Sequence, residues 1–293
     1  MMAPEEGPKI GFVTSADFPD LAPDDIFAAQ ALASAGYRVV PAIWNNRHVN
    51  WKEFQIIIIR SCWDYHKHPS RFREWIGEME RSALPVWNPT DILRWNMEKS
   101  YLLDLQAKNI EIPRTILLNP NDEFEPAAIA RSLSDSVVIK PAISASAWKT
   151  WKLAPGKFGT DDVNKLNQLR DHSAIVVQEF MPEIESAGEW SFIFFGEFSH
   201  AVRKVPASGD FRVQEEHGGT AVPEQSPPHG LLRQAERILA SIGREVLYAR
   251  IDAVERAGRL ILMELELIEP QLYFEYSEAG VQRFVRRVSG LLK

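Results

Sequence analysis

Apolar and polar positions follow two patterns over the first 90 residues of the chain. Short apolar runs predict four strands, at residues 9–14, 37–41, 54–59 and 84–87. Between these runs, apolar residues at helical spacing predict helices, at 26–35 after Asp24 and at 69–81. The isoleucine run at 56–59 is typical of a strand that is buried on both faces of a parallel sheet. Strands that alternate with helices predict an open parallel α/β sheet built from right-handed βαβ units.

The pattern changes after about residue 92. Two antiparallel hairpins are predicted, at 189–195 with 198–205 and at 248–254 with 260–267. Further strands are predicted at 115–118, 137–140 and 175–180, and further helices at 97–107, 231–242 and 278–291. Irregular segments are a polar connection at 119–126 and a Gly-containing loop at 209–220. We therefore expect an α/β part at 1–92 and an α+β part at 93–293, with subdomains at about 113–180 and 181–293.

Charge and cysteine content narrow the functional classes. The 293 residues carry 40 acidic and 33 basic side chains, and this net charge of -7 argues against a general nucleic-acid binder while allowing a local basic pocket. The single cysteine, Cys62, excludes an intramolecular disulfide and a Cys-rich zinc site, and it fits a cytoplasmic protein. We find no secretory signal, and no apolar run is long enough to span a membrane.

Three carboxylates fall on the second predicted hairpin. Glu264 and Glu266 are two residues apart, so on a strand both side chains project from one face, and Asp252 lies on the partner strand. Leu265 and the flanking Met263 are expected to point the other way, into a core. Clustered carboxylates repel one another unless a cation binds between them, and oxygen ligands suit Mg²⁺. The hairpin therefore predicts a magnesium site.

Two lysines and a basic loop are candidates for phosphate binding. Lys140 ends a strand and precedes a small-residue loop at 142–147, where an ammonium group and backbone N–H groups can surround phosphates. Lys99 falls in the first turns of a predicted helix, against the helix dipole, which hints at a role outside the helix. A third group predicts an anion pocket and consists of Arg203, Lys204, Arg212, His217 and the glycines that follow it.

Two strand ends carry candidate recognition residues. At the end of the strand at 175–180, backbone groups can read an adenine edge while Phe180 and Met181 pack on its face. Ligands of open α/β sheets bind beyond the carboxyl ends of the strands. The segment after the isoleucine strand is therefore placed for substrate recognition, through Arg60, Trp63, Asp64 and Tyr65. Packing is the favoured role for Cys62, because no histidine is clearly placed to activate it.

Each of these patterns also has an alternative without chemistry. The hairpin carboxylates would then form a solvated face paired with Arg250 or Arg259, and the two lysines would be ordinary surface residues. The adenine-reading segment would be a strand end followed by a turn, and the basic group would be a surface hairpin. The aromatic residues after the isoleucine strand would cap the sheet, while Arg60 pairs with Asp64.

The order of these motifs along the chain is more specific than any one of them. A helix lysine, a strand lysine with a small-residue loop, an adenine hinge, a basic Gly-Gly loop and a hairpin with Asp and Glu-x-Glu together resemble the ATP-grasp superfamily. Over nearly the whole chain, the sequence is most similar to the glutathione-synthetase-like carboxylate–amine ligases. Residues 60–65 and 263–270 also resemble a smaller subgroup that includes the cycloserine-forming cyclo-ligase.

The resemblance implies a fold, ligands and residue roles. Residues 1–92 would be a pre-ATP-grasp domain, followed by an ATP-grasp region that binds ATP with one or two Mg²⁺ ions, for which Mn²⁺ can substitute. Lys99 and Lys140 would contact the ATP phosphates under a flap at Ser144 to Ala147. Adenine and ribose would be bound by Gln178, Glu179, Phe180, Met181 and Glu189. Lys204 and Arg212 would face the reacting groups, and the metal would be bound by Asp252, Glu264 and Glu266. Many members have Asn at the position of Glu266 and glycines in the flap. Homodimers are common among members.

The implied activity is ligation of a small-molecule carboxylate to an amine. A carboxylate does not condense with an amine at neutral pH unless it is activated, and phosphoryl transfer from ATP gives an acylphosphate that an amine attacks. One alternative is a non-catalytic, nucleotide-binding regulatory protein of the same fold. A dehydrogenase is the other alternative, which the sequence disfavours because no Gly-x-Gly-x-x-Gly motif follows the first strand.

Overall fold

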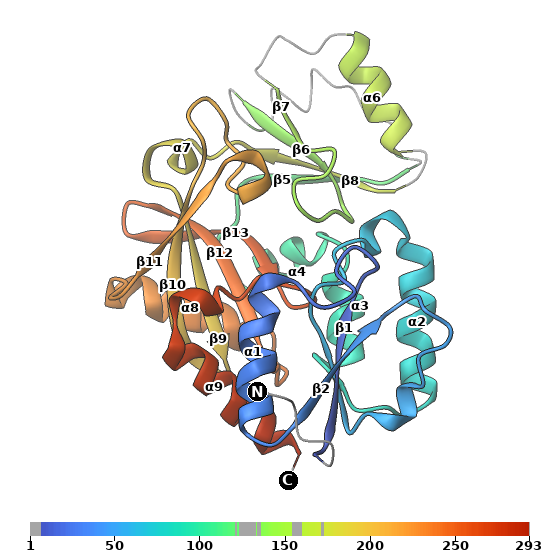
Figure 1. Ribbon diagram of the computed structural model, residues 1–293. Helices are drawn as coiled ribbons and strands as arrows, with labels where there is room; N and C mark the ends of the chain where they lie inside the picture. Colours follow the sequence, from blue (N-terminus) through green and yellow to red (C-terminus); the bar gives the residue numbers. More distant parts are fainter. Residues whose placement is uncertain are drawn as a thin grey trace.

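Three sheets organise the molecule (Figure 1). The computed structural model describes residues 7–120, 122, 133, 136–153, 160–170 and 173–292. Most of the predicted polar connection at 119–126 lies outside these residues. Among the helices that the structure describes, none has the length and apolar character needed to cross a membrane.

The N-terminal sheet is parallel, as predicted, and its strand order is β2-β1-β3-β4. Its strands are β1 (Lys9–Thr14), β2 (Arg38–Ile43), β3 (Ile56–Ile59) and β4 (Val86–Trp87). Its connections contain α1 (Pro23–Ser34), η1 (Trp51–Glu53), η2 (Tyr65–Lys67) and α2 (Pro69–Arg81). All four isoleucines of β3 are buried, which confirms a strand that is covered on both faces.

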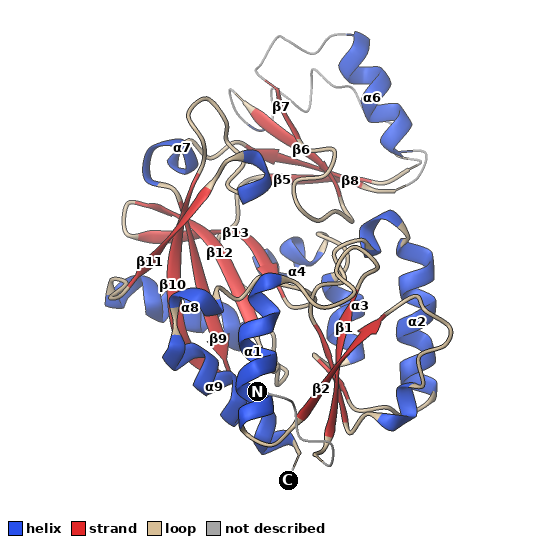
Figure 2. Cartoon of the chain, viewed as in Figure 1, coloured by secondary structure: helices blue, strands red, loops and turns tan. Residues whose placement is uncertain are grey.

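A small antiparallel sheet follows, with the strand order β5-β8-β6-β7. Its strands are β5 (Thr115–Leu118), β6 (Val137–Pro141), β7 (Trp151–Leu153) and β8 (Ile175–Glu179), with α6 (Thr160–Arg170) packed beside them. The sequence analysis did not predict β7 or α6. Figure 2 shows this sheet and its helix at the top of the molecule, apart from the other two sheets.

The large sheet is antiparallel, with the strand order β11-β10-β9-β12-β13. Its strands are β9 (Glu189–Phe195), β10 (Glu197–Val205), β11 (Thr220–Glu224), β12 (Ala249–Arg256) and β13 (Arg259–Glu266). Both predicted hairpins are confirmed, whereas η3 (Glu215–His217) and β11 replace part of the predicted loop at 209–220. The surrounding helices are α7 (Glu183–Ala187), α8 (His229–Ser241), η4 (Phe274–Tyr276) and α9 (Glu278–Leu291).

The predicted helix at 97–107 is wrong at its N-terminal end. The chain forms α3 (Thr90–Asn96) and α4 (Tyr101–Ala107), and Lys99 lies in the turn between them. The lysine therefore precedes the helix that it was expected to enter. The predicted domain boundary at residue 92 falls within α3 and stays a prediction.

One apolar core joins the N-terminal sheet to the large sheet. Phe12 of β1 and Phe195 of β9 both contact Phe284 of α9, with ring centroids 6.4 and 5.4 Å away. The same core includes residues of α1 and β3, and α1 packs beside α9 (Figure 1). Because apolar interiors are closely packed, this shared core fixes the N-terminal sheet against the large sheet.

Candidate active site

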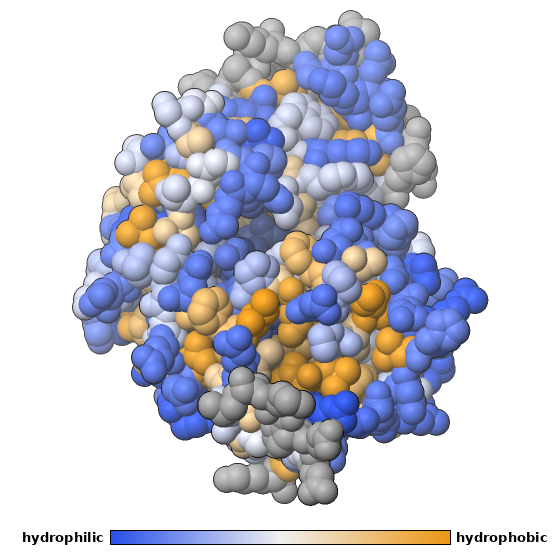
Figure 3. Space-filling view, viewed as in Figure 1, coloured by the Kyte–Doolittle hydropathy of each residue, from blue (hydrophilic) through white to orange (hydrophobic). Residues whose placement is uncertain are grey.

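A cavity of about 1100 Å³ is lined by strand residues of the small and large sheets, and by loop and helix residues of the N-terminal part and of the segments between the sheets. The space-filling view shows the molecule hollowed near the centre of one face, with hydrophilic surface around the hollow (Figure 3). Most of the predicted site residues line this cavity: Trp63, Asp64, Tyr65, Lys99, Lys140, Ser144, Gln178, Glu179, Phe180, Met181, Glu189, Lys204, Arg212, His217, Glu264 and Glu266. Arg60, Arg203 and Asp252 do not line it.

The register of β12 and β13 places the hairpin carboxylates. Asp252 lies opposite Glu264, and Arg250 lies opposite Glu266. A β-bulge follows the pair of Asp252 and Glu264. The next pair is Ala253 and Leu262, so Met263 has no partner on β12. The expectation that Met263 points into a core is confirmed only in part: Met263 packs against the cluster that contains Met181 and Val254, apart from the cluster of Leu265, and it also lines the cavity.

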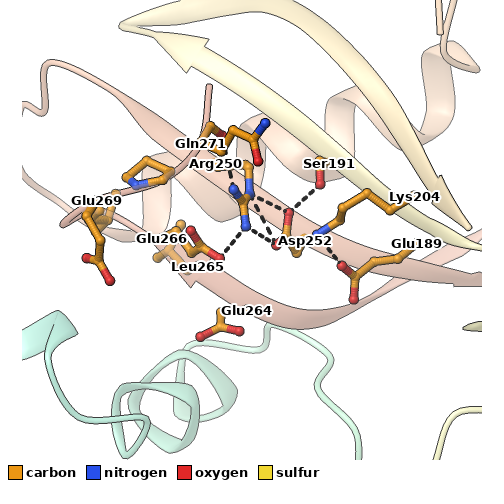
Figure 4. A network of polar contacts seen from close by, with 12 residues as sticks. Glu189, Ser191, Lys204, Arg250, Asp252, Glu264, Leu265, Glu266, Glu269 and Gln271 are labelled. Atoms are coloured by element: carbon orange, nitrogen blue, oxygen red, sulfur yellow. Dashed lines mark hydrogen bonds and ion pairs between the residues drawn. The ribbon is translucent and has the colours of Figure 1, made fainter. Parts of the chain in front are cut away.

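Cations neutralise the carboxylates in this region (Figure 4). Lys99 Nζ is 2.7 Å from Glu264 Oε1, and the Arg250 guanidinium pairs with Glu266. Lys204 Nζ is 2.5 Å from Glu189 Oε1 and 2.9 Å from Asp252 Oδ2. The pairing of Glu266 with Arg250 matches part of the alternative that the sequence left open.

Asp252 is held inside this network rather than exposed to the cavity. It is 2% exposed, accepts hydrogen bonds from Arg250 and Lys204, and accepts another from Ser191 Oγ at 2.6 Å. Burial by itself would raise the pKa of Asp252. The charges of Arg250 and Lys204 exceed this effect and hold the pKa well below its usual range. In this arrangement Asp252 positions two cations, so its predicted role as a metal ligand is not supported.

Glu264 and Glu266 nevertheless fit a divalent cation. Both line the cavity from one face of β13, and Mg²⁺ is commonly held by one or two carboxylates together with substrate phosphates. Burial and the charges of Asp252 and Glu264 raise the pKa of Glu266 to about 7, because together they exceed the lowering effect of Arg250. A bound divalent cation would lower this pKa again. No group of three or more His, Cys, Asp or Glu side chains in the described ranges is arranged to hold a metal by itself. A magnesium ion bound by these two carboxylates would take its other ligands from phosphates and water.

The turn that contains Lys99 is attached to the predicted flap at Ser144 to Ala147, and from here on the name flap also covers Trp148 and Lys149. The Lys99 backbone N–H donates to the Ala142 carbonyl at 2.8 Å, and its ammonium donates to the Ser144 carbonyl at 2.7 Å. Further along the flap, Trp148 lies 5.2 Å from the ring of His66 in η2. The flap therefore contacts both the lysine turn and the N-terminal part of the cavity.

Three flap residues have left-handed backbone conformations that glycine adopts more readily. Ser146, Ala147 and Lys149 each have φ of 51°. The resemblance had indicated glycines in this region. The flap therefore keeps a glycine-like geometry with residues for which that geometry is strained.

An apolar slot lies at the end of β8. Phe180, Met181 and Met263 line the cavity there, and Phe211 approaches Phe180 edge-on with 6.1 Å between ring centroids. The buried Gln178 side chain donates to Thr115 Oγ1 at 3.0 Å, which anchors the strand end. Lys152 Nζ lies 3.4 Å from the centroid of the Phe180 ring. Apolar side chains at the wall of a cavity are typical of sites that take an aromatic ligand.

The predicted basic group is only partly brought together. Lys204 and Arg212 line the cavity, and Arg212 also pairs with Asp210 at 2.7 Å. Arg203 does not line the cavity, because alternation along β10 turns it toward Trp190 and Glu224 on the other face. Its expected place in an anion pocket was therefore wrong.

Arg60 is a structural residue instead of a substrate contact. It is 2% exposed, donates from Nε to Asp25 Oδ1 at 2.7 Å and lies over the ring of Tyr248. Neither the substrate role nor the alternative pairing with Asp64 is supported, since Asp64 accepts a hydrogen bond from Trp44 at 2.7 Å. The buried pair fixes α1 against the end of β3.

The other residues of this segment divide between packing and the cavity. Tyr65 is 4% exposed and belongs to a core cluster, although part of it reaches the cavity. Trp63 and Asp64 are more open to the cavity. Burial raises the pKa of Cys62 well above its usual range, so the thiol is not activated and the expected packing role is supported.

Side chains hold the backbone after β13 in a fixed conformation. We call residues 267–275 the platform segment. Six consecutive backbone carbonyls, from Leu267 to Leu272, accept side-chain hydrogen bonds from Asn88, Tyr248, Trp63, Arg60, Arg250 and His200 respectively. Both carboxylate oxygens of Asp24 accept backbone N–H groups, those of Leu272 and Phe274, at 2.7 Å. Asp24 lies in the first turn of α1, as its prediction as a helix start requires, and its side chain also binds this segment.

The platform segment contributes site residues that the sequence analysis missed. Glu269, Gln271, Tyr273 and Glu275 line the cavity, while the intervening Pro270, Leu272 and Phe274 are buried. The signal was available, because apolar and polar residues alternate over 268–274. Pro270 interrupts this alternation and argues against a regular strand, so the pattern alone does not predict an ordered segment.

Comparison with known protein families settles what this arrangement belongs to. Residues 103–254, just over half of the chain, match the ATP-grasp domain of prokaryotic glutathione synthetases. The chain belongs to this family. Residues 10–88 match the N-terminal domain of D-cycloserine synthetase DcsG. These matches confirm the ATP-grasp resemblance and the prediction of an ATP-dependent carboxylate–amine ligase.

Similar proteins span most of the chain. The cycloserine biosynthesis protein DcsG of Streptomyces lavendulae is 23% identical over 281 residues, which cover 90% of this chain and 92% of that protein. A glutathione synthetase of Rhodopseudomonas palustris is 23% identical over 212 residues, which cover 71% of this chain and 64% of that protein. The crystal structure of D-cycloserine synthetase DcsG has a TM-score of 0.86 at 22% identity and covers 97% of this chain and all of its own. This agreement shows a shared fold.

Proposed function

We propose that this ATP-grasp ligase activates the carboxylate of a small amino-acid-like substrate with ATP. The carboxylate oxygen attacks the γ-phosphorus, the bond to the β-phosphate oxygen breaks, and an acylphosphate and ADP form. An amine then attacks the acyl carbon, loses a proton and displaces phosphate, so that a C–N bond replaces the C–O bond. The observation that carries the proposal is one cavity in which Lys99, Lys140 and Lys204 lie with the carboxylates of Glu264 and Glu266.

The nucleotide is proposed to lie along the small sheet and the flap. Phe180 and Met181 offer an apolar surface for adenine, and Lys99 and Lys140 offer cations for the phosphates under the flap. Burial lowers the pKa of Lys140 to about 8, so its ammonium is poorly solvated and favours an anionic partner.

The transferred phosphoryl group is proposed to meet Lys204 and Arg212. Phosphoryl transfer depends mainly on position and on neutralising charge, and both side chains reach the cavity. Glu264 and Glu266 would hold Mg²⁺, which supplies charge neutralisation on phosphate oxygens. Lys204 is itself held by Glu189 and Asp252, so its ammonium group is oriented before any ligand arrives.

Water must be kept from the acylphosphate, because hydrolysis would waste it. The contact between Trp148 of the flap and His66 of η2 covers the cavity on that side. No enzyme nucleophile is required by this chemistry, in agreement with the buried, unactivated thiol of Cys62.

A screen for ADP release tests the proposal directly. Amino acids and dipeptides are supplied in pairs with Mg²⁺ and ATP, and molecules that carry both a carboxylate and an amine are included, because one relative is named for cycloserine biosynthesis. We expect ADP and phosphate to appear only when both groups are present. ATP binding without ADP formation across the whole panel would instead favour the regulatory alternative.

A further inference from the structure

Acidic and aromatic side chains form the N-terminal side of the cavity. We call this region the acidic lobe and define it by Asp17, Trp63, Asp64, Glu269 and Tyr273, all of which line the cavity. The backbone carbonyl of Glu269 accepts the indole N–H of Trp63 at 2.8 Å, which connects the platform segment to the N-terminal sheet at this point.

Glu269 differs from Glu264, Glu266 and Glu189 of the same cavity, because no ion pair among the described residues neutralises its carboxylate. Glu264, Glu266 and Glu189 each pair with a lysine or arginine. The contacts of the described residues give the Glu269 carboxylate no hydrogen bond and no ion pair, and Figure 4 shows it turned away from Arg250 and Asp252. Burial and the nearby Glu266 charge raise the pKa of Glu269 well above its usual range. Among the described residues, this half-buried carboxylate therefore has no hydrogen-bond donor and no cation of its own.

We propose that Glu269 binds a positively charged amino group of the substrate and thereby selects amino-bearing carboxylic acids. This inference rests on the proposed function, because it assigns the substrate end of the same cavity. An ammonium group gives the carboxylate both the counter-charge and the hydrogen-bond donors that the protein does not supply.

The distribution of charge along the cavity supports an ammonium group over a neutral donor. Asp17, Asp64 and Lys67 also line the cavity, from the N-terminal part of the chain. Lys140 of the small sheet and Lys204 of the large sheet line it as well, whereas Lys99 is close enough for its charge to act on Glu269. A molecule with an ammonium group at one end and a carboxylate at the other matches this division of charge, and its carboxylate is the group to be activated.

The platform segment makes Glu269 a precise contact. Side chains bind the carbonyls of Ile268, Glu269 and Pro270, through Tyr248, Trp63 and Arg60 respectively. The backbone on both sides of the carboxylate is thus fixed before a ligand binds, and little ordering entropy opposes binding.

The test measures binding of paired probes to protein that is loaded with Mg²⁺ and a non-hydrolysable ATP analogue. The probes are the D- and L-forms of alanine and serine, with lactate, glycerate and propionate as counterparts that lack the amino group. Calorimetry on the native chain should show binding of at least one amino-bearing probe and at least about tenfold weaker binding of its counterparts. Glu269→Gln should weaken binding of the amino-bearing probe by about tenfold or more, and Glu269→Asp should weaken its binding by less.

A matched control separates this effect from a general one. Glu236 is an exposed glutamate of α8 outside the cavity, so Glu236→Gln should bind the same probe as the native chain does. Affinity for the ATP analogue should stay unchanged in every variant, which also reports that each one is folded.

Three outcomes would overturn the proposal. They are unchanged probe affinity in Glu269→Gln, equal affinity for amino-bearing and amino-free probes, and the absence of any amino-bearing probe that binds. Failure of the ligase proposal looks different: probes would bind through Glu269 while no pair of substrates releases ADP.

Discussion

The ammonium of Lys99 and the carboxylate of Glu264 form an ion pair, with 2.7 Å between Nζ and Oε1. The pair joins the turn before α4 to strand β13, so it connects a proposed phosphate contact with a proposed magnesium ligand. Burial by itself would raise the pKa of Glu264, but the charges of Lys99 and Lys140 exceed this effect and lower the pKa. The carboxylate therefore stays ionised, and Mg²⁺ with ATP would replace this contact by binding both partners.

Replacing Glu264 with glutamine should abolish turnover. Gln keeps the size of the side chain but removes the charge that a hard cation requires. We expect ADP release to fall by about a hundredfold or more, roughly 3 kcal/mol of transition-state stabilisation. Binding of Mn²⁺ in the presence of ADP, followed by electron paramagnetic resonance, should weaken in parallel. Glu255→Gln on the neighbouring strand is the control, and full activity of Glu264→Gln would remove the metal assignment.

Nucleotide affinity should fall as the pH rises through about 8. Burial lowers the pKa of Lys140 from 10.5 to about 8, and only the protonated side chain attracts phosphate. ATP binding above that pH should therefore take up a proton, which calorimetry in buffers of different ionisation enthalpy detects. Lys140→Arg should remove this step, because arginine stays protonated. A flat affinity between pH 7 and 9.5 in the native chain would contradict the assignment.

The same group has the opposite effect on stability. Between about pH 8 and 10.5 the unfolded chain holds more protons on residue 140 than the folded chain does. The contribution of Lys140 to the free energy of unfolding therefore rises with pH across that window. Comparing urea unfolding of the native chain with that of Lys140→Met over the window isolates this contribution.

Arg60→Met should destabilise the fold strongly. The variant leaves the Asp25 carboxylate buried without its cation, which costs about 3–5 kcal/mol. Arg94, which pairs with Glu80 at the surface, provides the control, and Arg94→Met should cost less than about 1 kcal/mol. Urea unfolding measures both. Adding Asp25→Asn to Arg60→Met should recover part of the lost free energy of unfolding. Equal losses in Arg60→Met and Arg94→Met would be inconsistent with a buried pair.

Ala147→Gly should stabilise the protein, contrary to the usual effect of glycine. Ala147 has φ of 51°, where an L-residue is strained by about 1–2 kcal/mol, and the entropic cost of glycine offsets about half of the gain. We expect a net gain of about 0.5–1 kcal/mol in the free energy of unfolding. Ala145, which has no positive φ, is the control: Ala145→Gly should lose about the same amount. A loss in both variants would show that the flap is not strained.

Local patterns were enough to predict the parallel sheet and both hairpins. The isoleucines of β3 and the spacing of Glu264 and Glu266 are repeated signals of period and burial, which the sequence displays directly. The short β7 and β11 were missed because each is only a few residues long and lies at a sheet edge, where pairing with a neighbour rather than side-chain pattern defines the strand.

Long-range partners were beyond local patterns. Arg60 contacts Asp25, 35 residues away, and the Pro270 carbonyl, 210 residues away, and no spacing rule connects such positions. The bulge at Met263 shifts the alternation of β13 by one residue, which a strict period of two cannot anticipate. Glu269 lies three residues after Glu266 in the sequence. Its proposed role depends on the absence of a neutralising side chain among the described residues, which the sequence does not display.

The platform segment also determines which part of the molecule is free to move. Its hydrogen-bond donors come from the N-terminal part of the chain, through Trp63 and Arg60, and from the large sheet, through Tyr248 and Arg250. These two parts are thus joined as a single rigid body. We expect nucleotide entry and product release to proceed by a swing of the small sheet about two pivots, the chain segments just before β5 and just after β8.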